Sequence, residues 1–148
     1  MPELPHPDLS TRPFSCTITG QMRAPAAALY AAWTTGIDTW FAAPGQIQLR
    51  PELGEPFVFY TEHDGQRQPH YGRFLALEPV HRVELTWLTG ADGTAGAETV
   101  VTVTLDPNSD GTLLRLTHAG FYDQPAADQH ATAWEEFVLP HLDDVLTS

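Results

Sequence analysis

Apolar side chains recur with helical spacing through the last part of the chain, from Asp123 to Leu146. At about 100° per residue one face collects apolar and aromatic side chains, and the other collects mostly acids. The pattern predicts one amphipathic helix of about 36 Å, which needs a wide apolar surface to lie on. Pro140 removes one backbone hydrogen bond and is expected to kink it. The predicted apolar face comprises Ala127, His130, Trp134, Phe137, Val138, His141, Leu142 and Val145.

Earlier in the chain, apolar and polar residues mostly alternate, which is typical of strands with one buried face. Pro25 is expected to open a first short helix, and residues 37–41 a second. Asp64-Gly65 has the composition of a hairpin turn. The expected strands are 14–22, 47–49, 57–60, 71–78, 82–87, 101–105 and 113–118.

The order of these elements indicates the fold class. Strands joined by short turns must be antiparallel, because a parallel step needs a crossover of a dozen residues or more. A twisted sheet and a long helix that each have one apolar face will bury each other, so the sheet should curl around the helix. We therefore expect one α+β domain over residues 14–148 and no doubly wound fold. Residues 1–13 contain four prolines and are expected to form a flexible lead-in.

Composition narrows the classes of partner. The formal net charge is −12, from nineteen acids against seven bases, and all seven bases are arginine. Such a surface repels phosphate backbones and anionic lipids, so we expect neither nucleic acid nor a membrane as a partner. The single cysteine, Cys16, has no partner for an internal disulfide. With no leader pattern and no apolar run near 18 residues, the sequence favours a cytoplasmic protein.

Few residues suggest chemistry. No nucleophile elbow, phosphate-binding loop or dinucleotide fingerprint is present, so no cofactor is expected. His130 and His141 would lie roughly 16 Å apart along a helix, too far to share a metal ion, and no metal is expected. His118 is the main polar candidate, either as an acid/base or ligand contact or as a structural hydrogen-bond partner. Asp123 is expected to cap the last helix.

Several short motifs occur in an order that resembles a known family. They are Met22-Arg23-Ala24-Pro25, Trp40-Phe41, Gly72-Arg73, Glu78-Pro79 through Thr86-Trp87, Glu98-Thr99-Val100-Val101, Gly111-Thr112, Leu116-Thr117-His118-Ala119-Gly120-Phe121 and finally Trp134. The chain resembles the Hsp90-ATPase-activator-homologue family of the START-like superfamily. This resemblance implies a helix-grip (Bet v 1-like) fold, with a curved antiparallel sheet of six to seven strands around the last helix. It also implies a pocket beneath that helix. Ala133 stands where the family usually has glycine.

Ligand binding is the leading functional expectation. A small apolar or aromatic molecule would occupy the cavity between sheet and helix, with His118 as an orienting group; the alternative is that the rings simply fill the core. A second hypothesis is a polyketide cyclase, dehydratase or hydrolase with His118 as acid/base. A third is a chaperone-interaction module, ranked last because the chain lacks a second domain. Exposed Leu139 and Val58/Tyr60 leave room for a homodimer. The expected lining residues are Trp40, Phe41, Phe59, Trp87, Val103, Leu116, His118, Trp134 and Phe137.

Overall fold

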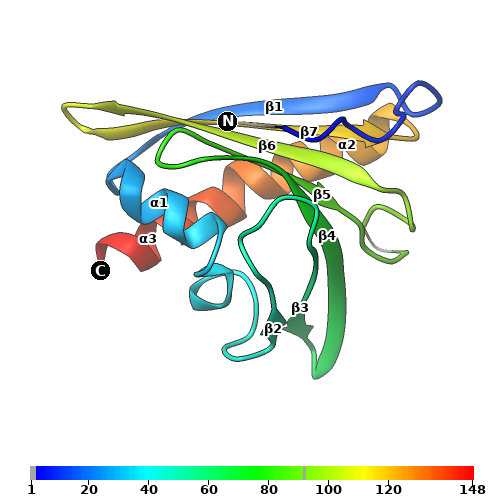
Figure 1. The fold of residues 1–148 in the computed structure, drawn as a ribbon, viewed down its shortest axis with the longest axis horizontal. Coiled ribbons are helices and arrows are strands. Elements are labelled where there is room, and N and C mark those ends of the chain that lie inside the picture. The colour runs from blue at the N-terminus through cyan, green and yellow to red at the C-terminus, as the bar shows by residue number, and fades with distance from the viewer. Residues whose placement is uncertain (1–2, 92) are drawn as a thin grey trace.

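In the computed structural model, which describes residues 3–91 and 93–148, seven strands form one antiparallel sheet of order β1-β7-β6-β5-β4-β3-β2 (Figure 1). Two short helical elements, α1 and the 3₁₀ turn η1, follow β1, and a long helix ends the chain. The elements are β1 (Phe14–Met22), α1 (Ala26–Trp33), η1 (Ile37–Thr39), β2 (Ile47–Gln48), β3 (Pro56–His63), β4 (Gln66–Glu78), β5 (Arg82–Trp87), β6 (Thr99–Asn108), β7 (Gly111–Phe121), α2 (Gln124–Ala133), the π-helical turn η2 (Trp134–Val138) and α3 (Leu139–Thr147).

The sheet curves around the long helix formed by α2, η2 and α3, which we call the C-terminal helix (Figure 1). β2, β3 and β4 turn away from the plane of β1, β7 and β6. Fully buried side chains such as Leu85, Leu114 and Leu116 fill the space between the sheet and the helices. The predicted α+β helix-grip fold is confirmed.

The β3–β4 hairpin is longer than the apolar pattern predicted. Asp64 and Gly65 both have left-handed backbone angles, with φ of 51° and 77°, which is the geometry of a two-residue hairpin turn. Pairing therefore starts at once, with His63 opposite Gln66, and β4 begins five residues before the expected start at Tyr71. Those five residues are polar, with the sequence Gln-Arg-Gln-Pro-His, so they lack the alternation that reveals a strand.

The C-terminal helix changes its pitch in the middle, and this corrects two sequence predictions. The amide of Leu139 donates to the carbonyl of Trp134, five residues back, so one extra residue enters that turn. Trp134 and Leu139 are consequently both buried, whereas Phe137 is 67% exposed. Phe137 therefore does not face the sheet, and Leu139 does not contribute to an exposed patch. The predicted homodimer stays a prediction.

Pro140 explains why the pitch changes there. Proline lacks the amide hydrogen, and in a regular α-helix its ring collides with the carbonyl four residues earlier, which here belongs to Glu136. The wider turn η2 lies directly before Pro140, and π-helical turns are one of the ways in which a helix accommodates such a residue. A continuous 100° wheel cannot represent this insertion, so Phe137 and Leu139 were placed on the wrong faces, whereas Leu142 is buried as predicted.

Residues 3–13 lie along the sheet face that is turned away from the C-terminal helix. The amide of Leu4 donates to the carbonyl of Leu75 over 2.8 Å, and His6 Nε2 lies 2.7 Å from the buried Glu84 carboxylate. The buried Arg12 donates from Nη1 to the carbonyl of Gly120 over 2.6 Å. The Pro-rich composition did not predict these contacts. The expected flexibility of the segment stays a prediction, because hydrogen bonds do not measure motion.

Asp123 caps the C-terminal helix, as predicted. Its backbone is extended and its carboxylate accepts from the amide of Ala126 over 2.9 Å. Replacing Asp123 with Ala should lower the free energy of unfolding by about 1 kcal/mol, because a first-turn amide loses its acceptor. Urea denaturation measures the change. Asp128→Ala is the matched control, since this exposed acid accepts only from the Gln124 side chain. Equal costs for the two variants would contradict the capping role.

Candidate functional site

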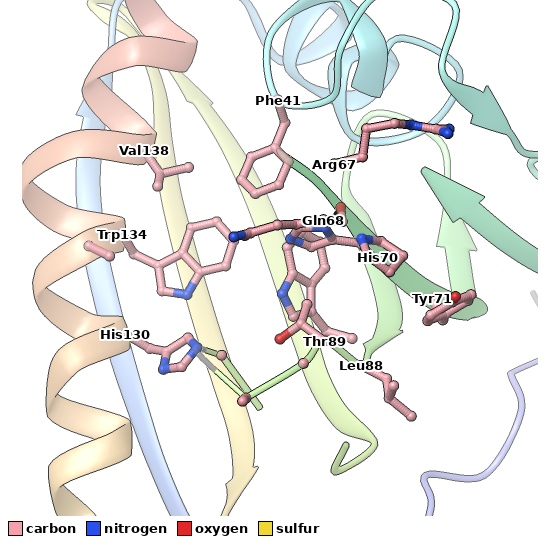
Figure 2. A pocket seen from close by; sticks show the side chains of 16 residues that line it. Phe41, Arg67, Gln68, His70, Tyr71, Leu88, Thr89, His130, Trp134 and Val138 are labelled. Atoms are coloured by element: carbon pink, nitrogen blue, oxygen red, sulfur yellow. Dashed lines mark hydrogen bonds between the residues drawn. The ribbon is translucent and has the colours of Figure 1, made fainter. Parts of the chain in front are cut away.

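A pocket of about 470 Å³ opens between β4, the loop after β5 and the C-terminal helix (Figure 2). Its walls come from distant parts of the chain: the end of the segment after η1, the β3–β4 hairpin, β5 and α2 with η2. The curvature of the sheet brings these segments together under the helix. The lining residues are Phe41, Arg67, Gln68, Pro69, His70, Tyr71, Trp87, Leu88, Thr89, Gly90, Ala91, Gly93, His130, Ala133, Trp134 and Val138.

Four rings form the inner wall of this pocket. Trp87 is central, with ring centroids 5.4 Å from Phe41, 5.3 Å from His70 and 5.6 Å from Trp134. These separations lie within the range of favourable aromatic contacts, and the tilted and edge-on geometries are the preferred ones. Trp87 is the last residue of β5 and Trp134 is the first residue of η2. Their rings therefore enter the pocket from the sheet and from the helix.

The sequence-predicted lining residues separate into three groups. Phe41, Trp87 and Trp134 line the pocket. Phe137 points into solvent. The others are buried in the core and do not line the pocket; Trp40, for example, donates from Nε1 to the carbonyl of Ala32 over 2.8 Å. The buried group comprises Trp40, Phe59, Val103, Leu116 and His118.

His118 is held in a closed hydrogen-bond chain. Its Nδ1 lies 3.1 Å from the indole Nε1 of Trp134, and its Nε2 lies 2.7 Å from the hydroxyl of Thr99. An indole N–H can only donate, so Nδ1 must accept and Nε2 must carry the hydrogen. The Thr99 hydroxyl then accepts from Nε2 and donates to the carbonyl of Trp87 over 2.5 Å. Both ring nitrogens of His118, the Trp134 indole N–H and the Thr99 hydroxyl therefore all have hydrogen-bond partners.

Burial removes His118 from proton chemistry. Its side chain is 0% exposed, and loss of hydration, with a smaller repulsion from His130, holds the pKa of His118 well below its usual value. The acid/base hypothesis required contact with water, and His118 has none. Of the two roles left open by the sequence, the geometry supports the structural one.

Two pocket histidines were missed as site residues. His70 lies in the polar start of β4, which the alternation did not reveal, and His130 was considered only as a metal ligand. The Nδ1 atom of His70 lies 3.3 Å from the carbonyl of Gln68, and that of His130 lies 2.9 Å from the carbonyl of Ala126. Burial lowers the pKa of His70 to about 4, so its ring is neutral near pH 7.

Arg67 is the one charged side chain among the described lining residues, and it is engaged elsewhere. Its Nε donates to Gln46 Oε1 over 2.8 Å, and its guanidinium lies 3.9 Å from the centre of the Tyr60 ring. Figure 2 shows this side chain directed away from the pocket. Within residues 3–91 and 93–148, no group of three histidine, cysteine, aspartate or glutamate side chains is placed to hold a metal ion.

Solved structures with the same architecture cover nearly the whole chain. A protein from Mesorhizobium loti superposes with a TM-score of 0.72 at 25% identity, over 90% of this chain and 96% of that one. A protein from Chromobacterium violaceum gives a TM-score of 0.74 at 21% identity, over 92% and 99% of the two chains. An Hsp90 activator from Plasmodium falciparum gives 0.67 at 19% identity, over 89% and 95%. The last two likenesses establish the fold alone.

Sequence comparison gives the family. No curated protein is significantly similar to the chain. In the described part of the chain, no helix is both long enough and apolar enough to cross a membrane. The profile of one family, described as Activator of Hsp90 ATPase homolog 1-like protein, matches residues 23–147, which include every pocket-lining residue. The resemblance first carried by the short motifs is thereby confirmed, and the chain belongs to the family of Activator of Hsp90 ATPase homolog 1-like proteins.

Proposed function

We propose that this protein binds a small, uncharged aromatic or apolar molecule in the pocket beneath the C-terminal helix, without catalysing a reaction. The observation that carries the proposal is the ring-lined pocket itself. Its volume of about 470 Å³ lies in the range typical of small-molecule sites, roughly 300–1,000 Å³. Phe41, Trp87 and Trp134 supply apolar area on which a flat molecule can lie.

The charges around the pocket support an uncharged ligand. Arg67 donates from Nε to the side-chain oxygen of Gln46, packs on the Tyr60 ring and is directed away from the pocket (Figure 2), so its charge does not face a bound ligand. The other described lining residues include no carboxylate, lysine or second arginine, and burial keeps His70 neutral near pH 7. A buried ligand charge would therefore have no counter-charge, and an unpaired charge is costly in such surroundings.

The enzymatic alternative finds little support in the geometry. General acid/base catalysis needs a titratable group within hydrogen-bond reach of the substrate. His118, the residue on which that hypothesis rested, is sealed behind Trp134 and Thr99. It does not border the pocket. Binding without turnover is the simpler reading of a pocket whose walls are rings and neutral polar groups.

Ligand titration followed by intrinsic tryptophan fluorescence tests the proposal, because Trp87 and Trp134 both line the pocket. We expect a saturable signal with some members of a panel of neutral bicyclic aromatics. Ala133→Phe should fill the pocket and weaken binding at least about tenfold, since added side-chain volume displaces the ligand. Ala133 lines the pocket next to Trp134 in sequence, which makes it the natural position for such a plug.

Thr132→Phe is the matched control, since the same ring is then added to the exposed neighbouring position of α2. This variant should bind as the unaltered protein does. Absence of a saturable signal across the panel would contradict the proposal. Unchanged affinity in Ala133→Phe would place binding elsewhere and contradict it equally.

A further inference from the structure

His70 and His130 face the pocket from different walls. His70 belongs to β4 and His130 to α2, and both line the pocket. Figure 2 shows the His130 ring extending from the helix toward the pocket. The His70 ring is packed between Phe59, on which it stacks at 4.9 Å, and the edges of Phe41 and Trp87. Both rings are therefore held in position by the protein before any ligand arrives.

The hydrogen bonds of the two rings fix which nitrogen carries the proton. Each Nδ1 lies within hydrogen-bond distance of a main-chain carbonyl, that of Gln68 for His70 and that of Ala126 for His130. A carbonyl oxygen can only accept, so Nδ1 must donate in both rings. In a neutral imidazole with Nδ1 protonated, Nε2 has a free lone pair and can only accept.

Neither Nε2 atom has a hydrogen-bond partner among the described residues. The one fully buried side-chain nitrogen or oxygen without a partner in the described part of the chain is Trp33 Nε1. The Nε2 atom of the buried His70 therefore is not sealed in the core and borders open space, which on this residue is the pocket. The ring of His70 stays neutral well below pH 7, since its pKa is about 4.

From this arrangement we infer that the pocket selects ligands that carry hydroxyl or N–H donors, such as phenols, over the same molecules lacking a donor. The inference rests on the proposed function and specifies the polar part of the ligand. A donor-bearing aromatic can satisfy His70 Nε2 or His130 Nε2 while its ring lies against Trp87. A purely apolar ligand would exclude water from these acceptors and leave them unpaired, which disfavours its binding.

Other polar groups of the pocket do not provide the same selection. The hydroxyl of Thr89 accepts from the amide of Thr94 over 2.8 Å, but this hydroxyl and that of Tyr71 can each both donate to and accept from a ligand. The side-chain amide of Gln68 lies on an exposed residue and has no partner among the described residues, but an amide both donates and accepts. Gln68 therefore accommodates ligand donors and acceptors alike, and the preference for donors comes from the histidines.

Three ligands with one ring system test the inference: a naphthalenediol, its dimethyl ether and naphthalene. Neither the ether nor naphthalene can donate a hydrogen bond, and the ether is larger than the diol whereas naphthalene is smaller. Weaker binding of both would therefore be due to the missing donor and not to ligand size. In calorimetric and fluorescence titrations at pH 7.5 we expect the diol to bind about tenfold more tightly than either. His70→Phe and His130→Phe should each reduce this ratio, and the double variant should reduce it to near one. His81→Phe, at an exposed histidine on the β4–β5 turn, should leave it unchanged.

A measurement on the unaltered protein covers the case in which a variant fails to fold. Binding of the diol should shift the ¹⁵N resonance of an unprotonated Nε2 from His70 or His130, and the ether should leave it in place. Equal affinities for all three ligands would overturn the inference while the proposed function stands. Failure of all three to bind would overturn both. A diol preference that survives in the double variant, without an Nε2 shift in the unaltered protein, would overturn the inference alone.

Discussion

Replacing His118 with Leu is expected to lower the free energy of unfolding by about 2–4 kcal/mol. The substitution leaves the indole N–H of Trp134 without an acceptor in a buried position. It also removes the donor to the Thr99 hydroxyl, which keeps only its bond to the carbonyl of Trp87. A buried donor that loses its partner costs about 1–3 kcal/mol, and imperfect packing of a branched aliphatic chain in the place of a flat ring adds to this.

Urea denaturation of the unaltered protein and four variants measures the effect and its origin. Thr99→Val breaks the same chain from the other end, so His118→Leu and Thr99→Val combined should cost less than the sum of the single changes. His81→Leu is the control, because this histidine is exposed and should tolerate the change. A loss below about 1 kcal/mol for His118→Leu, or strict additivity with Thr99→Val, would show that the hydrogen-bond chain does not stabilise the fold.

The same variant separates a structural His118 from a catalytic one. If His118 held the site together and took no part in chemistry, His118→Leu would lose stability while the folded fraction kept its ligand preference. A catalytic residue would show the opposite result, because its removal would abolish turnover without a comparable loss of stability. The 0% exposure of the ring and the completed hydrogen bonds at both nitrogens favour the first result.

Local patterns were sufficient to predict most of the fold. Alternation placed β1 at its observed bounds, and the turn residues Asp64-Gly65 marked the β3–β4 hairpin. Short connections imposed antiparallel pairing, which all the strand pairs of the described sheet have. These features depend on residues that are close in the sequence, so the sequence alone is enough to predict them.

The errors occurred where a distant or unusual contact decided the outcome. Phe137 was predicted to face the sheet because a regular helical wheel assumes that no residue is inserted, whereas η2 contains one inserted residue. The polar residues before Tyr71 joined β4 because the tight turn paired them with β3, against their own pattern. In both cases a backbone constraint took precedence over side-chain character.

The candidate site shows a similar division. The family resemblance implied Phe41 and Trp87, and the apolar faces of the strands and the last helix indicated Trp87 and Trp134; all three line the pocket. The sequence also assigned His118 correctly to the inner face of the sheet. The face of a strand does not tell how deeply a side chain is buried, and the His118 ring is fully buried and does not line the pocket. His70 and His130 were missed as a pair because only the folded chain brings β4 opposite α2.

Acid should destabilise this protein through its buried neutral histidines. An unfolded histidine has a pKa near 6.5, whereas burial lowers the pKa of folded His70 to about 4. Between these values the unfolded chain binds more protons than the folded one, so the free energy of unfolding falls as pH falls. The contribution of His70 is complete above pH 6.5 and decreases by about 3 kcal/mol by pH 4. His118, whose pKa burial also lowers, adds a loss of the same sign.

Comparison of variants isolates this effect from the protonation of the many surface acids. The quantity to measure is the difference in the free energy of unfolding between pH 7 and pH 4, by urea denaturation. His70→Phe should reduce that difference by about 3 kcal/mol, because phenylalanine cannot bind a proton and can stack on Phe59 as the imidazole does. His81→Phe is the matched control, because it places the same ring at an exposed position outside the pocket. If the two variants have the same pH dependence, His70 is not held neutral by the fold, and its lone pair is then no fixed acceptor for a ligand at acidic pH.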